Sequence, residues 1–83
     1  MPELWEGAVS YPREGSTIMV KQPIEAYYHR YNGVMLLPGV AARVVNPRVI
    51  AVSGNRPYFS LVKFEHEGQV YQASVWPGEW NYA

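Results

Sequence analysis

The chain has 83 residues and no cysteine, and its seven basic residues balance seven acidic ones, so it carries no formal net charge at pH 7. A chain of this length forms a single domain with a small core, and without cysteine it has no disulfides, thiolate metal sites or iron–sulfur clusters of its own. The charge balance also disfavours nucleic acid as a partner, because such interfaces normally need an excess of basic residues.

Membrane insertion and secretion are not expected either. No apolar run approaches the roughly 18–20 residues that a membrane-spanning helix requires. The N-terminal residues lack the basic and then apolar pattern of a signal peptide. We therefore expect a soluble, cytoplasmic protein that binds no membrane.

Turn residues divide the chain into runs of strand length that are rich in β-branched and aromatic side chains. Residues 1–16 show no hydrophobic period, which predicts an N-terminal tail or strap ahead of a domain at 17–83. The predicted strands are Thr17–Gln22, Val40–Val45, Pro47–Ser53, Tyr58–Glu65 and Gln69–Trp76. About five short strands predict an all-β fold, a barrel or a sandwich, and we favour a small SH3-like barrel because closure leaves few unpaired strand edges.

The segment Pro23–Asn32 is ambiguous. Pro23 at a possible first turn and Glu25 close behind it fit a short helix. Its three tyrosines lower helix propensity and favour a strand. We predict an extended segment, with a helix as the alternative, followed by an unusually apolar loop over Asn32–Pro38.

The last third of the chain predicts a β-hairpin most clearly. The strands Tyr58–Glu65 and Gln69–Trp76 flank His66-Glu67-Gly68, in which the glycine supplies the positive φ that a short hairpin loop needs. Alternation along the strands also predicts a core that contains Ile18, Val44, Val62 and Phe64.

No residue set has the pattern of a catalytic or metal site. His66 is expected to be a solvated turn residue, and His29 a half-exposed strand residue within a polar and aromatic patch. No serine follows the strand–turn–helix pattern of a hydrolase nucleophile, and no two glutamates have a spacing that suggests a shared proton. We therefore expect no catalytic residues and no cofactor or metal in this chain.

Aromatic residues give the best indication of function. Three Trp, seven Tyr and two Phe exceed what so small a core can bury. Tyr, Trp and Arg are enriched at the centres of protein interfaces, so exposed copies beside arginine indicate a binding surface.

The order of several short motifs resembles the variable (alpha) subunit of ferredoxin:thioredoxin reductase, a small SH3-like barrel. The matching pieces are IMVKQP followed by AYYH, then LLPGVAARVV, then AVSGNRPYFSLVKFE, and finally the closing WPGEW. Together they span about Thr17 to Trp80. Their order and spacing carry the resemblance more than any single piece.

The resemblance implies a noncatalytic subunit that forms a heterodimer with a catalytic subunit and stabilises it. The iron–sulfur cluster and redox disulfide would belong to that partner, in the cyanobacterial cytosol or the plastid stroma. Its sequence signatures fall on Tyr28-His29 and Ser53–Pro57, and we predict a partner-binding surface that contains Tyr28, His29, Arg56 and Tyr58. An SH3-like peptide-binding module is the alternative.

Overall fold

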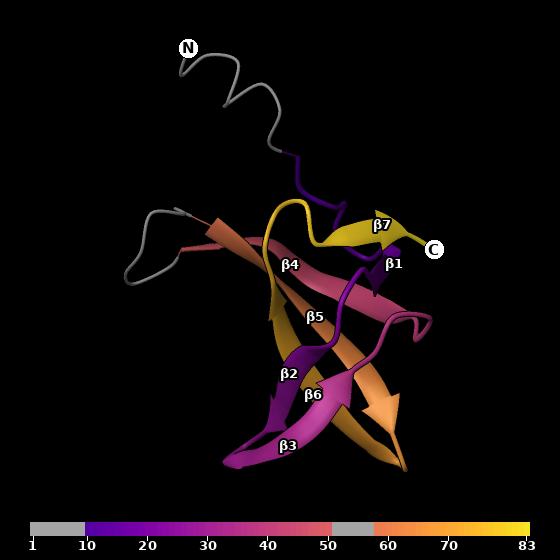
Figure 1. The fold of residues 1–83 in the computed structure, drawn as a ribbon. Helices are drawn as coiled ribbons and strands as arrows, with labels where there is room; N and C mark the ends of the chain where they lie inside the picture. Colours follow the sequence, from indigo (N-terminus) through magenta and orange to yellow (C-terminus); the bar gives the residue numbers. More distant parts are fainter. Residues whose placement is uncertain (1–9, 51–57) are drawn as a thin grey trace.

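The computed structural model describes residues 10–50 and 58–83, which form seven β-strands and no helix. The strands are β1 (Thr17–Val20), β2 (Ile24–Tyr28), β3 (Tyr31–Leu36), β4 (Ala42–Ile50), β5 (Tyr58–His66), β6 (Gln69–Val75) and β7 (Trp80–Tyr82). They build one antiparallel sheet in the order β3-β2-β6-β5-β4-β1-β7, which curls into a half-barrel (Figure 1). The predicted all-β class is confirmed, with seven strands where about five were expected.

The predicted C-terminal hairpin is confirmed as β5 and β6. The two strands pair continuously from Ser60↔Val75 to His66↔Gln69, and Glu67 and Gly68 form the two-residue loop. Both loop residues have positive φ, 52° and 82°, as the tight turn of a twisted hairpin requires. This hairpin forms the centre of the sheet.

The predicted extended conformation of Pro23–Asn32 is confirmed, and the alternative helix does not form. The segment turns back on itself at His29 and Arg30, so that β2 and β3 make a second hairpin. The predicted loop over Asn32–Pro38 is wrong, because most of it is strand β3. Val34 and Leu36 face the core while Met35 faces outward, and this alternation buries enough apolar surface to favour a strand despite Gly33.

The predicted break between Val40–Val45 and Pro47–Ser53 is also wrong within the described residues. One long strand, β4, runs through it, and residues 51–53 lie outside the described residues. The ladder with β5 shifts register between Val44 and Val49 and then continues. At this bulge the Asn46 side-chain oxygen accepts the Arg48 N–H at 3.0 Å. A bulge tolerates proline, which lacks a ladder donor, so Asn46-Pro47 bends the strand without ending it.

The core lies on the inner face of the curled sheet. All four predicted core residues are buried there, and Ile18 and Val62 are fully excluded from solvent. Among the described residues, the buried core cluster consists of Ile18, Val20, Ala26, Leu36, Ala42, Val44, Val62, Phe64, Ala73 and Val75. They come from every strand except β7, so the core depends on pairing between distant parts of the chain. Within the described residues, no helix has the length and apolar character needed to cross a membrane.

Candidate functional site

Two of the predicted partner-binding residues lie at the tip of the β2–β3 hairpin. Tyr28 ends β2, and its ring lies 4.2 Å from that of His29, centroid to centroid. His29 begins the two-residue turn with a φ of 53° and is exposed to solvent. Its placement in a turn differs from the half-exposed strand position that was expected for it.

Tyr71 on β6 connects this tip to the end of the core. Its ring contacts Tyr28 edge to face at 6.1 Å, stacks on Phe64 at 6.1 Å and meets His66 at 6.0 Å. Both histidines therefore border one aromatic cluster. These ring contacts hold the hairpin tip, which lies at the lower end of the half-barrel in Figure 1.

The carboxylate near His66 is that of Glu67 at 3.6 Å, and both side chains are largely in solvent. Over residues 10–50 and 58–83, no three histidine, aspartate or glutamate side chains converge in a way that would hold a metal ion. Through its ring contacts, the aromatic cluster positions the tip of the β2–β3 hairpin.

The other two predicted residues are Arg56 and Tyr58. Arg56 lies outside the described residues, and Tyr58 begins β5 at the opposite end of the sheet. Phe64 lies six positions after Tyr58 along β5, which corresponds to about 20 Å of extended strand. There the ring of Tyr58 contacts Tyr11 edge to face. The structure thus separates Tyr58 from Tyr28 and His29.

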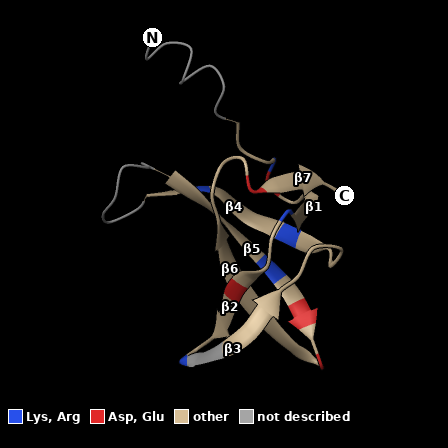
Figure 2. Cartoon of the chain, in the orientation of Figure 1, with Lys and Arg blue, Asp and Glu red and all other residues tan. Residues whose placement is uncertain are grey.

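Within residues 10–50 and 58–83, β3 is an edge strand with no neighbour on its outer side. β3 pairs on one side with β2 and ends the sheet on the other. Its sequence, YNGVML, contains no charged residue and no proline, and the part of β3 that is coloured in Figure 2 is tan. Natural proteins usually protect such an edge with charge, proline or a covering segment, because unpaired N–H and C=O groups attract other strands.

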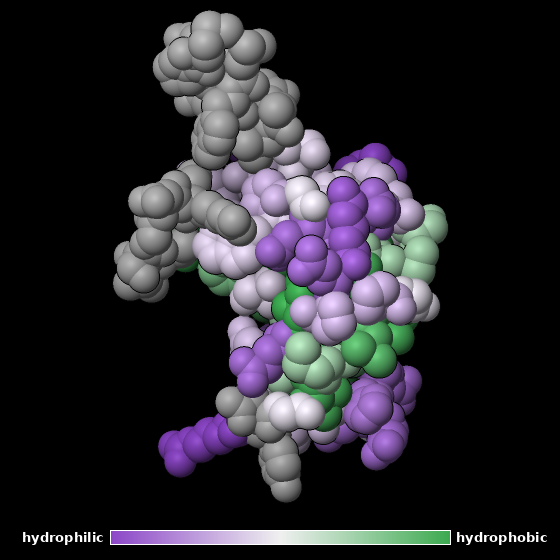
Figure 3. Space-filling model, viewed as in Figure 1, coloured by the Kyte–Doolittle hydropathy of each residue, from purple (hydrophilic) through white to green (hydrophobic). Residues whose placement is uncertain are grey.

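Exposed apolar side chains accompany this edge. Met35 on the outer face of β3 is 43% exposed, and Leu37 and Val40 in the following turn are 48% and 37% exposed. Figure 3 shows apolar side chains gathered over β3 and the segment that follows it. We call Met35, Leu37, Val40 and the free side of β3 the edge surface. Sequence reasoning missed it, although the run NGVMLLP was the signal that marked it.

The turn after β3 is built to hold the edge surface in place. The Val40 N–H donates to the Leu37 carbonyl at 3.1 Å, which closes a four-residue turn. Pro38 and Gly39, with a φ of 95°, occupy the central positions of a type II turn. Proline limits the freedom of this turn in the unfolded chain, so Leu37 and Val40 are presented at little entropic cost.

The outer face of the sheet carries a row of four cross-strand neighbours with polar groups. Arg43, Lys63, Gln72 and Tyr27 are cross-strand neighbours on four adjacent strands. Glu14 and Glu65 line the same hollow as the two cations. The opposite charges balance there, so this face does not favour one class of charged ligand.

Comparisons with protein-family models, with curated proteins and with solved structures find no match to this chain.

Proposed function

We propose that this chain is a noncatalytic subunit that binds and stabilises a larger protein partner through the edge surface. The observation that carries the proposal is the uncharged edge strand β3 with its three exposed apolar neighbours. A partner that supplies a strand or an apolar face to this edge would pair its backbone groups and remove Met35 and Leu37 from water. Tyr28 and His29, at the tip of the same hairpin, would border the interface.

The size of the domain supports a stabilising partner. A domain of this length buries only about 60–65% of the surface of its unfolded chain, and its stability is correspondingly modest. Each additional apolar side chain buried against a partner adds roughly 1.5–3 kcal/mol before the costs of association. The complex would therefore stabilise this chain as well as its partner.

We further propose that the partner is the iron–sulfur catalytic subunit of an enzyme like ferredoxin:thioredoxin reductase. The two chains would form a heterodimer in the cytosol or plastid stroma. This further proposal is supported by the order of motifs that resembles the variable subunit, and by a chain without cysteine that leaves cluster and redox disulfide to the partner. The alternative function, an SH3-like module that binds one extended peptide, is favoured by the same open edge.

The test is a tagged wild-type chain and its Met35→Lys variant, used to isolate a complex from lysate of the source cells by size-exclusion chromatography. Lysine protects natural sheet edges, and here it would face Glu25 across the β2–β3 ladder, so the fold is retained. We expect partner affinity to fall at least tenfold in a titration with the recovered partner. Ile50→Lys, at an exposed position on β4, is the matched control and should bind as wild type does.

The outcomes separate the parts of the proposal. Unchanged affinity of Met35→Lys would exclude the edge surface, and failure of the wild-type chain to form any complex would overturn the function itself. A recovered partner without the visible absorption of an iron–sulfur cluster would overturn the redox form. If one peptide from the partner's sequence binds this chain as tightly as the whole partner does, the peptide-binding alternative would be favoured.

A further inference from the structure

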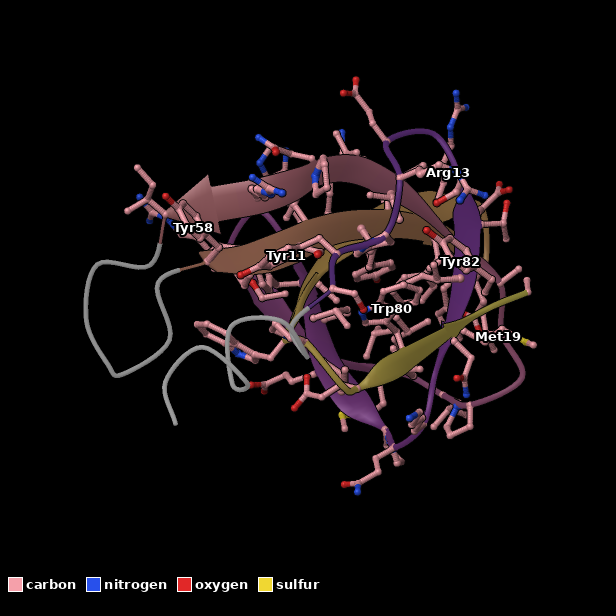
Figure 4. All side chains as sticks on the ribbon, turned by 90° about the horizontal axis from the view of Figure 1, so that it is seen from above. Tyr11, Arg13, Met19, Tyr58, Trp80 and Tyr82 are labelled. Carbon is pink, nitrogen blue, oxygen red and sulfur yellow. The ribbon has the colours of Figure 1, made fainter. Side chains whose placement is uncertain are left out.

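The segment Ser10–Ser16 crosses the end of the half-barrel opposite the β2–β3 hairpin tip, and we call it the strap. Figure 4 views this end from above, with the strap between Tyr58 on one side and Tyr82 on the other. The C-terminal part of the strap is fixed to β4, because the Gly15 N–H donates to the Val44 carbonyl at 2.8 Å and the Val44 N–H donates to the Ser16 carbonyl at 2.9 Å. Before Gly15, the contacts of Tyr11 and Arg13 with the sheet involve side chains.

The first contact set lies around Tyr11. Its ring meets Tyr58 edge to face, with 6.2 Å between centroids and an interplanar angle of 86°. The guanidinium of Arg48 lies over the same ring at 5.2 Å from its centroid. Arg48 follows the bulge in β4, where Asn46 accepts its backbone N–H. Tyr11 is therefore held between an aromatic edge and a cation from two neighbouring strands.

The second contact set lies around Arg13. Its backbone N–H donates to the hydroxyl oxygen of Tyr82 at 3.0 Å, and its guanidinium lies over the Tyr82 ring at 4.7 Å from the centroid. Trp80 supports that ring edge to face at 4.8 Å and itself packs against the core. Tyr82 thus offers a hydroxyl acceptor and an aromatic face in a fixed orientation.

Pro12, between these two residues, is fully buried. Proline has no backbone N–H, so its burial leaves no donor without a partner. The three residues therefore fill three adjacent positions: an aromatic ring against Tyr58 and Arg48, a buried pyrrolidine ring, and an arginine on Tyr82. Aromatic stacking, proline burial and arginine contact are also ways in which proteins bind extended peptides. Here the strap, which belongs to the same chain, makes all three.

We infer that Tyr11–Arg13 is an internal ligand, and that the end of the half-barrel beneath it is a binding site for a segment of another protein with proline between an aromatic residue and arginine. The walls of this site come from β4, β5 and β7, which pair within the sheet without the strap. Gly15, with a φ of 81°, is the point where the strap leaves its backbone contacts with β4. The site is separate from the edge surface on β3.

Competition with the strap determines the affinity that an external segment shows. A ligand joined to its site by a few residues acts at an effective concentration of about millimolar. An external peptide of the same sequence therefore binds weakly to the wild-type chain. If the strap loses its own side-chain contacts while the walls stay intact, the apparent affinity for the external peptide rises, which is the opposite of what a merely structural strap predicts.

The experiment titrates a capped peptide, SYPREGS, into the purified full chain and into its Tyr11→Ala/Arg13→Ala double variant, with binding followed by NMR chemical shifts. We expect apparent affinity to be at least tenfold higher for the double variant. A peptide of the same composition in scrambled order, and the Met35→Lys chain with an intact strap, are the controls. The scrambled peptide should not bind, and Met35→Lys should behave as wild type does.

Addition of Tyr82→Leu to the double variant removes the wall and should abolish the gain. If the double variant does not fold, Arg13→Ala alone keeps Tyr11 and Pro12 in place and should show a smaller gain of the same sign. Equal affinity of wild-type and strap-weakened chains, or equal binding of the scrambled peptide, would overturn the inference. Because the experiment contains no partner of the edge surface, its outcome is independent of the proposed function.

Discussion

Ser60 shows how one polar side chain is accommodated in this small core. It is 1% exposed, and its hydroxyl donates to the Pro47 carbonyl at 2.9 Å. That carbonyl belongs to the β4 bulge, where the regular ladder is interrupted. The serine hydroxyl therefore ties the bulge to the neighbouring strand.

Replacing Ser60 with alanine tests this role. We expect Ser60→Ala to lower the free energy of unfolding by about 1 kcal/mol, because the part-buried Pro47 carbonyl loses a donor. Urea denaturation followed by fluorescence measures the change. Ser74→Ala, a partly exposed serine on β6, is the control and should change stability by less than about 0.5 kcal/mol. Equal effects of the two substitutions would contradict the proposed tie.

At the scale of elements, the β5–β6 turn contains a residue, Glu67, whose type does not suit the backbone conformation that it adopts. Glu67 adopts a φ of 52°, which a residue with a long side chain rarely takes, and Gly68 follows it with 82°. Two-residue turns of this kind strongly prefer Asn-Gly. The contact of Glu67 with His66 lies in solvent and adds little.

We therefore expect Glu67→Asn to raise the free energy of unfolding by about 0.5 kcal/mol, through relief of backbone strain. Gly68→Ala is the matched opposite, and it should lower stability by about 1–2 kcal/mol. Since an added Cβ at Gly68 meets no atom within 4 Å, that loss would come from the backbone alone. Thermal melting of both variants is the measurement, and the same sign for both would be inconsistent with the turn geometry.

At the scale of the whole molecule, stability depends on one shared core. Phe64 is 6% exposed and links the buried cluster to Tyr71 at the lower end of the half-barrel. Phe64→Ala should cost about 3–5 kcal/mol, which is enough to unfold a domain of this size at ambient temperature. Circular dichroism melting measures it, with Phe59→Ala on the partly exposed face as the milder control. A Phe64→Ala chain that melts like wild type would contradict the central role of this ring.

The second prediction at this scale concerns the metal content and the visible absorption of the purified chain. The chain has no cysteine, and the described residues contain no cluster of metal-binding side chains. We expect the purified, untagged chain to be colourless and free of stoichiometric metal. Elemental analysis and an absorption spectrum provide the test. One metal ion per chain, retained after dialysis against a chelator, would refute this expectation.

The sequence by itself determined the features that depend on neighbours along the chain. The β5–β6 hairpin followed from alternating side chains on either side of a glycine turn, and burial of Ile18, Val44, Val62 and Phe64 followed from the same alternation. The extended conformation of Pro23–Asn32 followed from its tyrosines. Each of these signals comes from residues close together in the sequence. Pairing with distant strands favours the same conformation, so the local prediction holds in the folded chain.

Only the tertiary structure decided features that depend on pairing across the sheet. Gly33 and Pro38 made β3 resemble a loop until β2 gave it a partner, and the ladder with β5 carried β4 through Asn46-Pro47. The length of β5 separates Tyr58 from Tyr28, and the fold brings the strap against Tyr58 and Tyr82, which are remote from it in sequence. The physical reason is that ladder hydrogen bonds and a shared core outweigh local turn preferences, and their partners are chosen by the fold.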